Sequence, residues 1–239
     1  DYKEAVKWWR MSADQGNAMA QYGLAWMYHD GTGVPKDPKE AIKRIRMSAN
    51  QGYDVAQLRL GVMYEFGEGI PHDYKEAAKW YRMSADQGQV KAQYNVGFMY
   101  ENGRGVPQDH KEAVKWYRMS ADQGDAMAQY YLGAMYAKGE GVPQNYKKAH
   151  AWLSISKANG YELAEKNLVN IMKKMTGEQI AESLSLSREI YRRILANKKA
   201  ISVQQENASA QYSPWNIDHN GTGMSQYDEE GKREGIGVG

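Results

Sequence analysis

The segment from Ala92 to Gly124 decides the fold, and it reads AQYNVGFMYENGRGVPQDHKEAVKWYRMSADQG. Almost all of the chain as far as Gly160 consists of copies of this segment. One alanine marks the period, because it recurs every 36 residues, at Ala20, Ala56, Ala92, Ala128 and Ala164. A fixed period of roughly 20 to 50 residues is typical of repeat arrays, in which each unit packs on its neighbours.

The later half of the segment predicts a helix over 109–124. Asp109 and Glu112 have the spacing of a capping box, in which each side chain binds a free backbone N–H at the start of the helix. Gly124 stands where a helix ends in the left-handed conformation. The same start recurs at Asp1, Asp37 and Asp73, whereas the copy at Asn145 lacks the glutamate. The apolar face predicted for the first copy consists of Ala5, Trp8, Trp9, Ser12 and Ala13.

The earlier half predicts a second type of helix, over 89–102, which ends at the Gly-x-Gly-Val-Pro loop. Its inner stripe is Ala92, Val96, Met99 and Tyr100, at helical spacing. Glycine inside a helix costs about 1 kcal/mol relative to alanine. A small residue nevertheless recurs at one position, as Ala25, Gly61, Gly97 and Gly133, which predicts that two helices approach closely there.

These signals predict an all-α solenoid of 36-residue helix–turn–helix repeats over residues 1–195. Its complete units are 17–52, 53–88, 89–124 and 125–160, with half repeats at both ends. Thr176 and Gln179 form a capping box that opens a capping helix over 177–195, whose predicted apolar face is Ile180, Leu184, Tyr191 and Ile194. Residues 196–239 lose the pattern and are rich in polar residues and glycine, so we expect a disordered, flexible tail.

Composition narrows the function. The chain has 31 basic and 29 acidic residues, without the basic excess expected of a nucleic-acid binder. No run approaches the roughly 18 apolar residues of a membrane span, and there is no cysteine. We therefore expect no nucleic acid, no membrane span and no cofactor, in a cytoplasmic or periplasmic compartment. Because the chain begins without Met inside a repeat, we expect a fragment of a longer array that self-associates through its open N-terminal edge.

The repeated residues resemble the Sel-1-like repeat family, a relative of the tetratricopeptide arrays. The copy from Ala128 carries the pattern most fully, with Leu132-Gly133, Tyr136, Gly139, Gly141-Val142, Ala149, Trp152 and Gly160. The resemblance covers about residues 1 to 175, and it departs from the pattern at Arg44, Ile70 and Lys157. It implies a right-handed α-superhelix and a bacterial scaffold or adaptor that binds other proteins.

Three catalytic or ligand-binding alternatives are weaker. The Gly-x-Gly loops follow helices and lack the Walker lysine of phosphate loops, so they read as helix ends. Ser154 and Lys157 match the Ser-x-x-Lys motif of penicillin-binding enzymes, but the Ser-Asp-Asn and Lys-Thr-Gly partner motifs are absent. The five histidines lack metal-ligand spacing. The sequence therefore predicts no catalytic, cofactor or metal site.

The candidate binding surface comes from positions of the first helix that change between repeats. They lie at i, i+4, i+7 and i+10, on one face away from the inner stripe, and tyrosines border them. In related arrays the first helices line the concave side, which binds partners. We predict that a protein or peptide binds Met19, Tyr22, Trp26, His29, Arg59, Val62, Lys91, Tyr94, Asn95, Phe98, Tyr130 and Tyr131. The alternative is that some of these rings pack onto the neighbouring unit.

The sequence thus favours a non-catalytic scaffold or adaptor. An immunity protein or inhibitor that blocks one cognate toxin would use the same surface, and the sequence does not separate the two. An enzyme acting on β-lactams or the cell wall would need a nucleophile and a base brought together, and the sequence shows no such pair.

Overall fold

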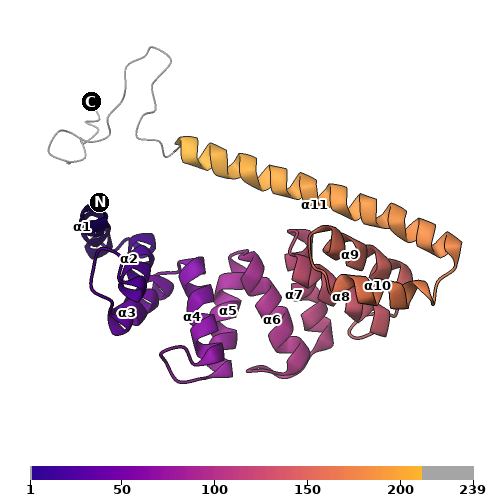
Figure 1. The fold of residues 1–239 in the computed structure, drawn as a ribbon, viewed down its shortest axis with the longest axis horizontal. Coiled ribbons are helices and arrows are strands. Elements are labelled where there is room, and N and C mark those ends of the chain that lie inside the picture. The colour runs from indigo at the N-terminus through magenta and orange to yellow at the C-terminus, as the bar shows by residue number, and fades with distance from the viewer. Residues whose placement is uncertain (1, 212–239) are drawn as a thin grey trace, which may run out of the picture. The chain divides into compact units, whose positions relative to one another are not determined.

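The computed structural model describes residues 2–211, and within them it shows eleven α-helices and no strand. Helices α1 to α10 follow one another in chain order along one axis (Figure 1). The prediction of an all-α repeat fold is confirmed. The helices are α1 (Tyr2–Asp14), α2 (Ala18–Asp30), α3 (Pro38–Asn50), α4 (Asp54–Phe66), α5 (Tyr74–Asp86), α6 (Val90–Asn102), α7 (His110–Asp122), α8 (Ala126–Lys138), α9 (Tyr146–Ala158), α10 (Ala164–Met172) and α11 (Gly177–Gln211).

Each unit pairs a first helix (α2, α4, α6 or α8) with a second helix (α3, α5, α7 or α9), and the predicted caps hold these helices in place. The Asp109 carboxylate accepts from the backbone N–H groups of Lys111 and Glu112 at 2.9 and 3.1 Å. Gly103, with φ +64°, ends the helix before the loop, which confirms that the loop glycines stop helices. The return half of the box is formed at Thr176, whose N–H donates to the Gln179 side chain at 3.0 Å.

The recurring small residue marks a close contact between the two helices of a unit, as predicted. A Cβ atom added to Gly97 would lie 2.8 Å from the ring of Tyr117, and one added to Gly61 would lie 2.5 Å from Tyr81. The first unit carries Ala25 there because its partner is the smaller Ile45, in the same core cluster. The last unit keeps glycine, since a Cβ on Gly133 would lie 2.8 Å from the Leu153 side chain.

A buried glutamine joins successive units, and the sequence pattern alone did not reveal it. Gln93 is 2% exposed, and its amide donates to the Ala85 carbonyl at the end of α5 at 3.3 Å. Its side-chain oxygen accepts from Gln123 at the end of α7 at 2.8 Å. The buried Ser120 adds a bond to the Val90 carbonyl at 2.9 Å. Equivalent glutamine bonds occur at Gln21, Gln57 and Gln129.

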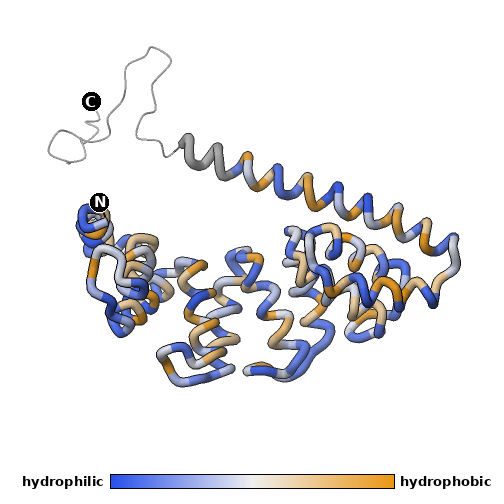
Figure 2. Tube along the Cα trace, in the orientation of Figure 1, coloured by the Kyte–Doolittle hydropathy of each residue, from blue (hydrophilic) through white to orange (hydrophobic). Residues whose placement is uncertain are grey.

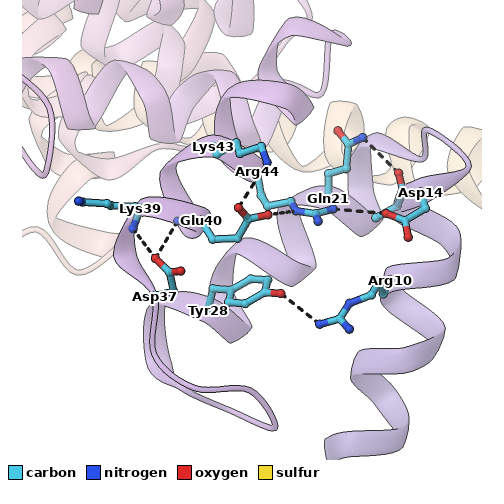
Figure 3. A network of polar contacts seen from close by, with 10 residues as sticks. Arg10, Asp14, Gln21, Tyr28, Asp37, Lys39, Glu40, Lys43 and Arg44 are labelled. Carbon is cyan, nitrogen blue, oxygen red and sulfur yellow. Dashed lines mark hydrogen bonds and ion pairs between the residues drawn. The ribbon is translucent and has the colours of Figure 1, made fainter.

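The first repeat junction shows how a departure from the pattern is accommodated (Figure 3). Arg44 replaces the tryptophan of the other second helices, and it donates to Glu40 at 2.7 Å and lies 3.8 Å from Asp14. Trp80 donates to Glu76 at 3.2 Å in the next unit, so the arginine keeps the bond that the indole makes.

Trp8 was predicted to lie on the apolar face of the first copy, and this prediction is wrong. Its side chain is 63% exposed, whereas Trp80 is 9% exposed in a cluster with Ile45 and Ala49 of the preceding repeat. Self-association through the N-terminal edge stays a prediction.

Helix α11 extends the predicted capping helix. It runs to Gln211, so the predicted boundary at Leu195 is wrong for residues 196–211, which contain no Gly or Pro to stop a helix. The rest of the predicted tail, residues 212–239, lies outside the described residues. By internal packing the chain divides into two compact units, Asp1–Tyr191 and Arg192–Gly239.

The buried face of α11 also differs from the prediction. Leu184 and Tyr191 are exposed, whereas Ser183 and Ile190 are buried. Ser183 tolerates burial because its hydroxyl donates to the Ile180 carbonyl at 2.7 Å and is hydrogen-bonded to Nδ1 of His150 in α9 at 2.8 Å. In the half repeat before it, Leu163 is exposed because α10 begins only at the next residue.

The helices contain both polar and apolar residues along their length, as the mixed colours in Figure 2 show. Within residues 2–211, no helix combines the length and the hydropathy that a membrane span requires.

We expect Gly105→Val to lower the free energy of unfolding by about 2 kcal/mol or more. Gly105 has φ +71°, and a Cβ there would lie 2.0 Å from the Tyr74 carbonyl oxygen. Lys111→Ala, at an exposed position, is the control and should leave stability within about 0.5 kcal/mol. Thermal melting compares the two variants, and equal melting temperatures would contradict this account of the loop.

We expect Gln93→Leu to lower the free energy of unfolding by about 1–3 kcal/mol, because it removes both hydrogen bonds of a buried amide, one to the Ala85 carbonyl and one from Gln123. The Ala85 carbonyl keeps the Gly88 N–H, and the Gln123 amide keeps the Gly88 carbonyl. Gln108→Leu is the matched control, since Gln108 is exposed and bonds only the Glu101 carbonyl at the surface. Urea unfolding measures both. If Gln93→Leu is as stable as Gln108→Leu, the buried glutamine does not fix the junction.

We expect the contact between α11 and α9 to weaken in acid. Burial lowers the pKa of His150 below its ordinary 6.5, so the folded state binds the proton less readily than the unfolded chain. The stability that neutral His150 contributes is complete above about pH 6.5 and is lost as the pH falls below it. Amide hydrogen exchange over residues 180–190, corrected for intrinsic rates, should show less protection at pH 5 than at pH 7.5. His150→Gln should remove most of that difference; an unchanged difference would assign it to other groups.

Candidate interaction groove

A groove runs across the first helices of all four complete units. Its volume is about 340 Å³, and its walls come from α2, α4, α6 and α8. The lining residues are Tyr22, Val55, Leu58, Arg59, Val62, Lys91, Tyr94, Asn95 and Met127. Six of them belong to the predicted binding set. The other six do not line it, so the predicted binding set stays a prediction.

The inner stripe and the predicted face separate as the periodicity indicated. Val96 and Met99 of α6 are 3% and 1% exposed, so they face the core. Lys91 is exposed, and Asn95 and Phe98 are half-buried on the same helix. None of the twelve predicted residues is buried, which leaves each of them some surface for a partner.

The centre of the groove is polar and positively charged. Arg59 of α4 and Lys91 of α6 both line it, together with the amide of Asn95. The Arg59 guanidinium is 2.7 Å from the Glu68 carboxylate, in a pair that is partly exposed. Lys91 has no ion-pair partner within residues 2–211. These groups supply donors to an anionic or carbonyl group of a bound chain.

An aromatic cluster forms the C-terminal end of the predicted surface. Tyr131 is its hub: it stacks on Tyr117 at 5.3 Å between ring centroids, and it lies 5.6 Å from Tyr94 and 6.5 Å from Phe98. Tyr130 meets Tyr131 edge-on at 5.3 Å and also contacts Tyr161 at 5.0 Å. The alternative that some rings pack onto a neighbouring unit therefore holds for part of the set. Apart from Tyr117, which is 0% exposed, these rings are half-buried, and they form a pre-organised apolar wall.

Two hydroxyls in this cluster are fixed in the protonated state. Burial, followed by the neighbouring Glu101 carboxylate, raises the pKa of Tyr117, whose hydroxyl donates to Glu101 at 2.6 Å. Burial, followed by Tyr131, raises the pKa of Tyr94. Both therefore act as neutral hydrogen-bonding groups rather than as nucleophiles.

The N-terminal end carries the remaining predicted residues. Trp26 is 45% exposed and contacts Tyr22 edge-on at 6.2 Å and His29 at 5.7 Å. His29 in turn lies 2.7 Å from the Asp30 carboxylate. Met19 is 56% exposed on the first turn of α2, and no ring contact ties it to this group. An exposed indole beside the groove provides apolar contact area for a partner.

The named set missed five residues that belong to the surface. Val55 and Met127 share the variable positions of the predicted residues, and Leu58 borders them, so the period could have identified all three. Tyr117 is in a second helix and Tyr161 follows α9, and nothing in the period indicates that their rings reach Tyr131 and Tyr130. Only the packing of one unit on the next brings them there.

The arrangement of the described side chains does not support the catalytic alternatives. Lys157 forms an ion pair with Glu165 of α10, which occupies the lysine that an Ser-x-x-Lys mechanism would use. In the part of the chain that the structure describes, no three His, Asp or Glu side chains are grouped so as to hold a metal ion.

The repeats match a known family model. The Sel1 repeat model matches residues 1–17, 18–53, 54–89, 90–125 and 126–161 in succession. The chain belongs to the Sel1 repeat family. Proteins of this family are generally non-catalytic scaffolds, and their fold typically serves protein interaction. A comparison with curated protein sequences finds no match.

Two solved bacterial structures are similar to this Sel1 repeat chain. One is a protective antigen of uropathogenic Escherichia coli with the same type of repeat, at 35% identity and a TM-score of 0.70. The match covers 82% of this chain and 42% of that one, so this chain spans less than half the length of that relative. The other is a Sel1 repeat protein from Oxalobacter formigenes, at 36% identity and a TM-score of 0.65, with 79% and 80% of the two chains covered.

Proposed function

We propose that this Sel1 repeat protein is a non-catalytic scaffold that binds an extended segment of a partner protein along its first helices. The groove that crosses α2, α4, α6 and α8 carries the proposal, because a surface continuous over four units suits an extended chain better than a small molecule. Six of the twelve predicted residues line it, and ring contacts link Trp26, Phe98 and Tyr131 to those six.

The distribution of side chains supports an extended ligand with mixed chemistry. Trp26 and Tyr22 at one end, and Phe98 and Tyr131 at the other, offer apolar anchors. Arg59 and Lys91 lie in the α4 and α6 walls of the groove. A segment with apolar residues on both sides of a polar or acidic one would match this order.

An inhibitor of one toxin would use the same surface, and it differs from an adaptor only in the partner. No described feature favours the toxin inhibitor over the adaptor, so identifying the partner would separate the two functions.

We expect Phe98→Ala to abolish partner capture while the protein melts near the wild-type temperature. Phe98 is half-buried, under the Arg104 guanidinium at 5.0 Å and edge-on to Tyr131, so its loss removes an apolar anchor worth about 2 kcal/mol or more in binding. Met99→Ala should instead lower the free energy of unfolding by about 2–5 kcal/mol, because that side chain is 1% exposed.

The test combines calorimetry on the purified variants with affinity capture from cells of the source organism, read by mass spectrometry. Met119→Ala is the matched control, an apolar side chain that is 45% exposed on the second helix α7. It should change neither capture nor melting. If Phe98→Ala captures the same proteins as wild type, or melts as early as Met99→Ala, the groove loses its proposed anchor.

A further inference from the structure

One junction of the array has a hollow on its second-helix side. It lies between α5 and α6, has a volume of about 270 Å³, and shares no lining residue with the groove. Its apolar walls are Ala78 of α5, Val96, Met99 and Tyr100 of α6, and Val106 of the following loop.

A single short side chain explains why the hollow occurs here. Ala78 stands where the other second helices carry a larger residue, at Val6, Ile42, Val114 and His150. At the preceding junction that residue fills the space, since a Cβ on the loop residue Gly69 would lie 2.8 Å from the end of the Ile42 side chain.

Three cations stand at the mouth of the hollow. Lys75, Lys79 and Arg82 line it from α5, at i, i+4 and i+7 on one helix face. Lys79 lies 3.5 Å from Glu76, and Arg82 donates to Asp86 at 2.9 Å, so two of the three have a carboxylate beside them. Lys75 has no ion pair in residues 2–211. The mouth thus keeps an excess of positive charge above an apolar floor.

The size of the hollow limits what it holds. Pockets for drug-sized ligands measure roughly 300–1,000 Å³, and this one is smaller and open to solvent on one side. We propose that it receives one large apolar side chain, of the size of phenylalanine or leucine, from an acidic peptide segment of a partner protein. The side chain fills the place left by Ala78, and the flanking carboxylates pair with Lys75, Lys79 and Arg82. This site is independent of the groove on the first helices.

The proposal is tested by fluorescence anisotropy with labelled pentapeptides on the purified full chain. Glu-Glu-Phe-Glu-Glu should bind saturably, and Glu-Glu-Gly-Glu-Glu and Gln-Gln-Phe-Gln-Gln should each bind at least tenfold more weakly. Methyl NMR of the bound protein should show shifts at Met99 and Val106, which line the hollow.

The decisive variant is Ala78→Ile, which installs the residue that the preceding repeat carries at Ile42. It should weaken binding of the phenylalanine peptide at least tenfold without lowering the melting temperature. If Ala78→Ile disturbs folding, Ala78→Val replaces it in the same test, since the next repeat carries Val114 at this position. Adding Val114→Ala to Ala78→Ile should restore binding, because it opens the same space at the next junction beneath Lys111, Lys115 and Arg118.

The groove variant Phe98→Ala should leave this binding unchanged, so failure here and failure of the groove proposal are distinguishable. The inference is overturned if Ala78→Ile binds the phenylalanine peptide as tightly as wild type does. It is equally overturned if the glycine peptide binds as tightly as the phenylalanine peptide, or if wild type binds neither.

Discussion

The buried glutamine at each junction is the interaction on which the array depends. The last carbonyls of a helix have no partner within it, and burial makes an unpaired carbonyl costly. At the end of α5 the Ala85 carbonyl accepts from the Gly88 N–H at 2.9 Å and from the Gln93 amide at 3.3 Å, and Gln93 in turn accepts from Gln123 at the end of α7. One side chain therefore ties a first helix to the second helices before and after it. Because the bonds have fixed geometry, they set the register of successive units, which apolar packing alone sets less strictly.

The second constraint on the array comes from glycine, which leaves room for a neighbouring element and also allows a positive φ. Gly97 lets the ring of Tyr117 lie against α6, and Gly105 lets the loop approach the backbone of the preceding second helix at Tyr74. Both contacts bring neighbouring elements closer than any side chain would permit. The array is therefore built from close contacts at one set of positions, and the outward positions of the first helices are free to differ between units.

Those free positions distinguish one unit from another. The middle units place Arg59 and Lys91 in the groove walls, whereas the same variable face carries Trp26 in the first unit and Tyr131 in the last. Ala78 shows the same principle on the second-helix side, where shortening one residue opens a hollow that the preceding junction fills. In a periodic scaffold, a site arises wherever one unit departs from its copies without disturbing the contacts that all units share.

The sequence by itself determined the period, the ends of the repeat helices and the inner stripe of the first helices, because caps, glycines and helical spacing are local signals. It thus separated Phe98 from Met99 correctly as outward and inward. It did not determine which side chains meet across 30 or more residues, such as Tyr130 with Asn167 or Ser183 with His150. It also placed Leu184 on the buried face of α11, where the serine lies instead. The spacing of residues along a helix determines the direction in which each side chain leaves that helix. Which residues the side chain then meets depends on how the helix packs against the next one, and only the tertiary structure decides this packing.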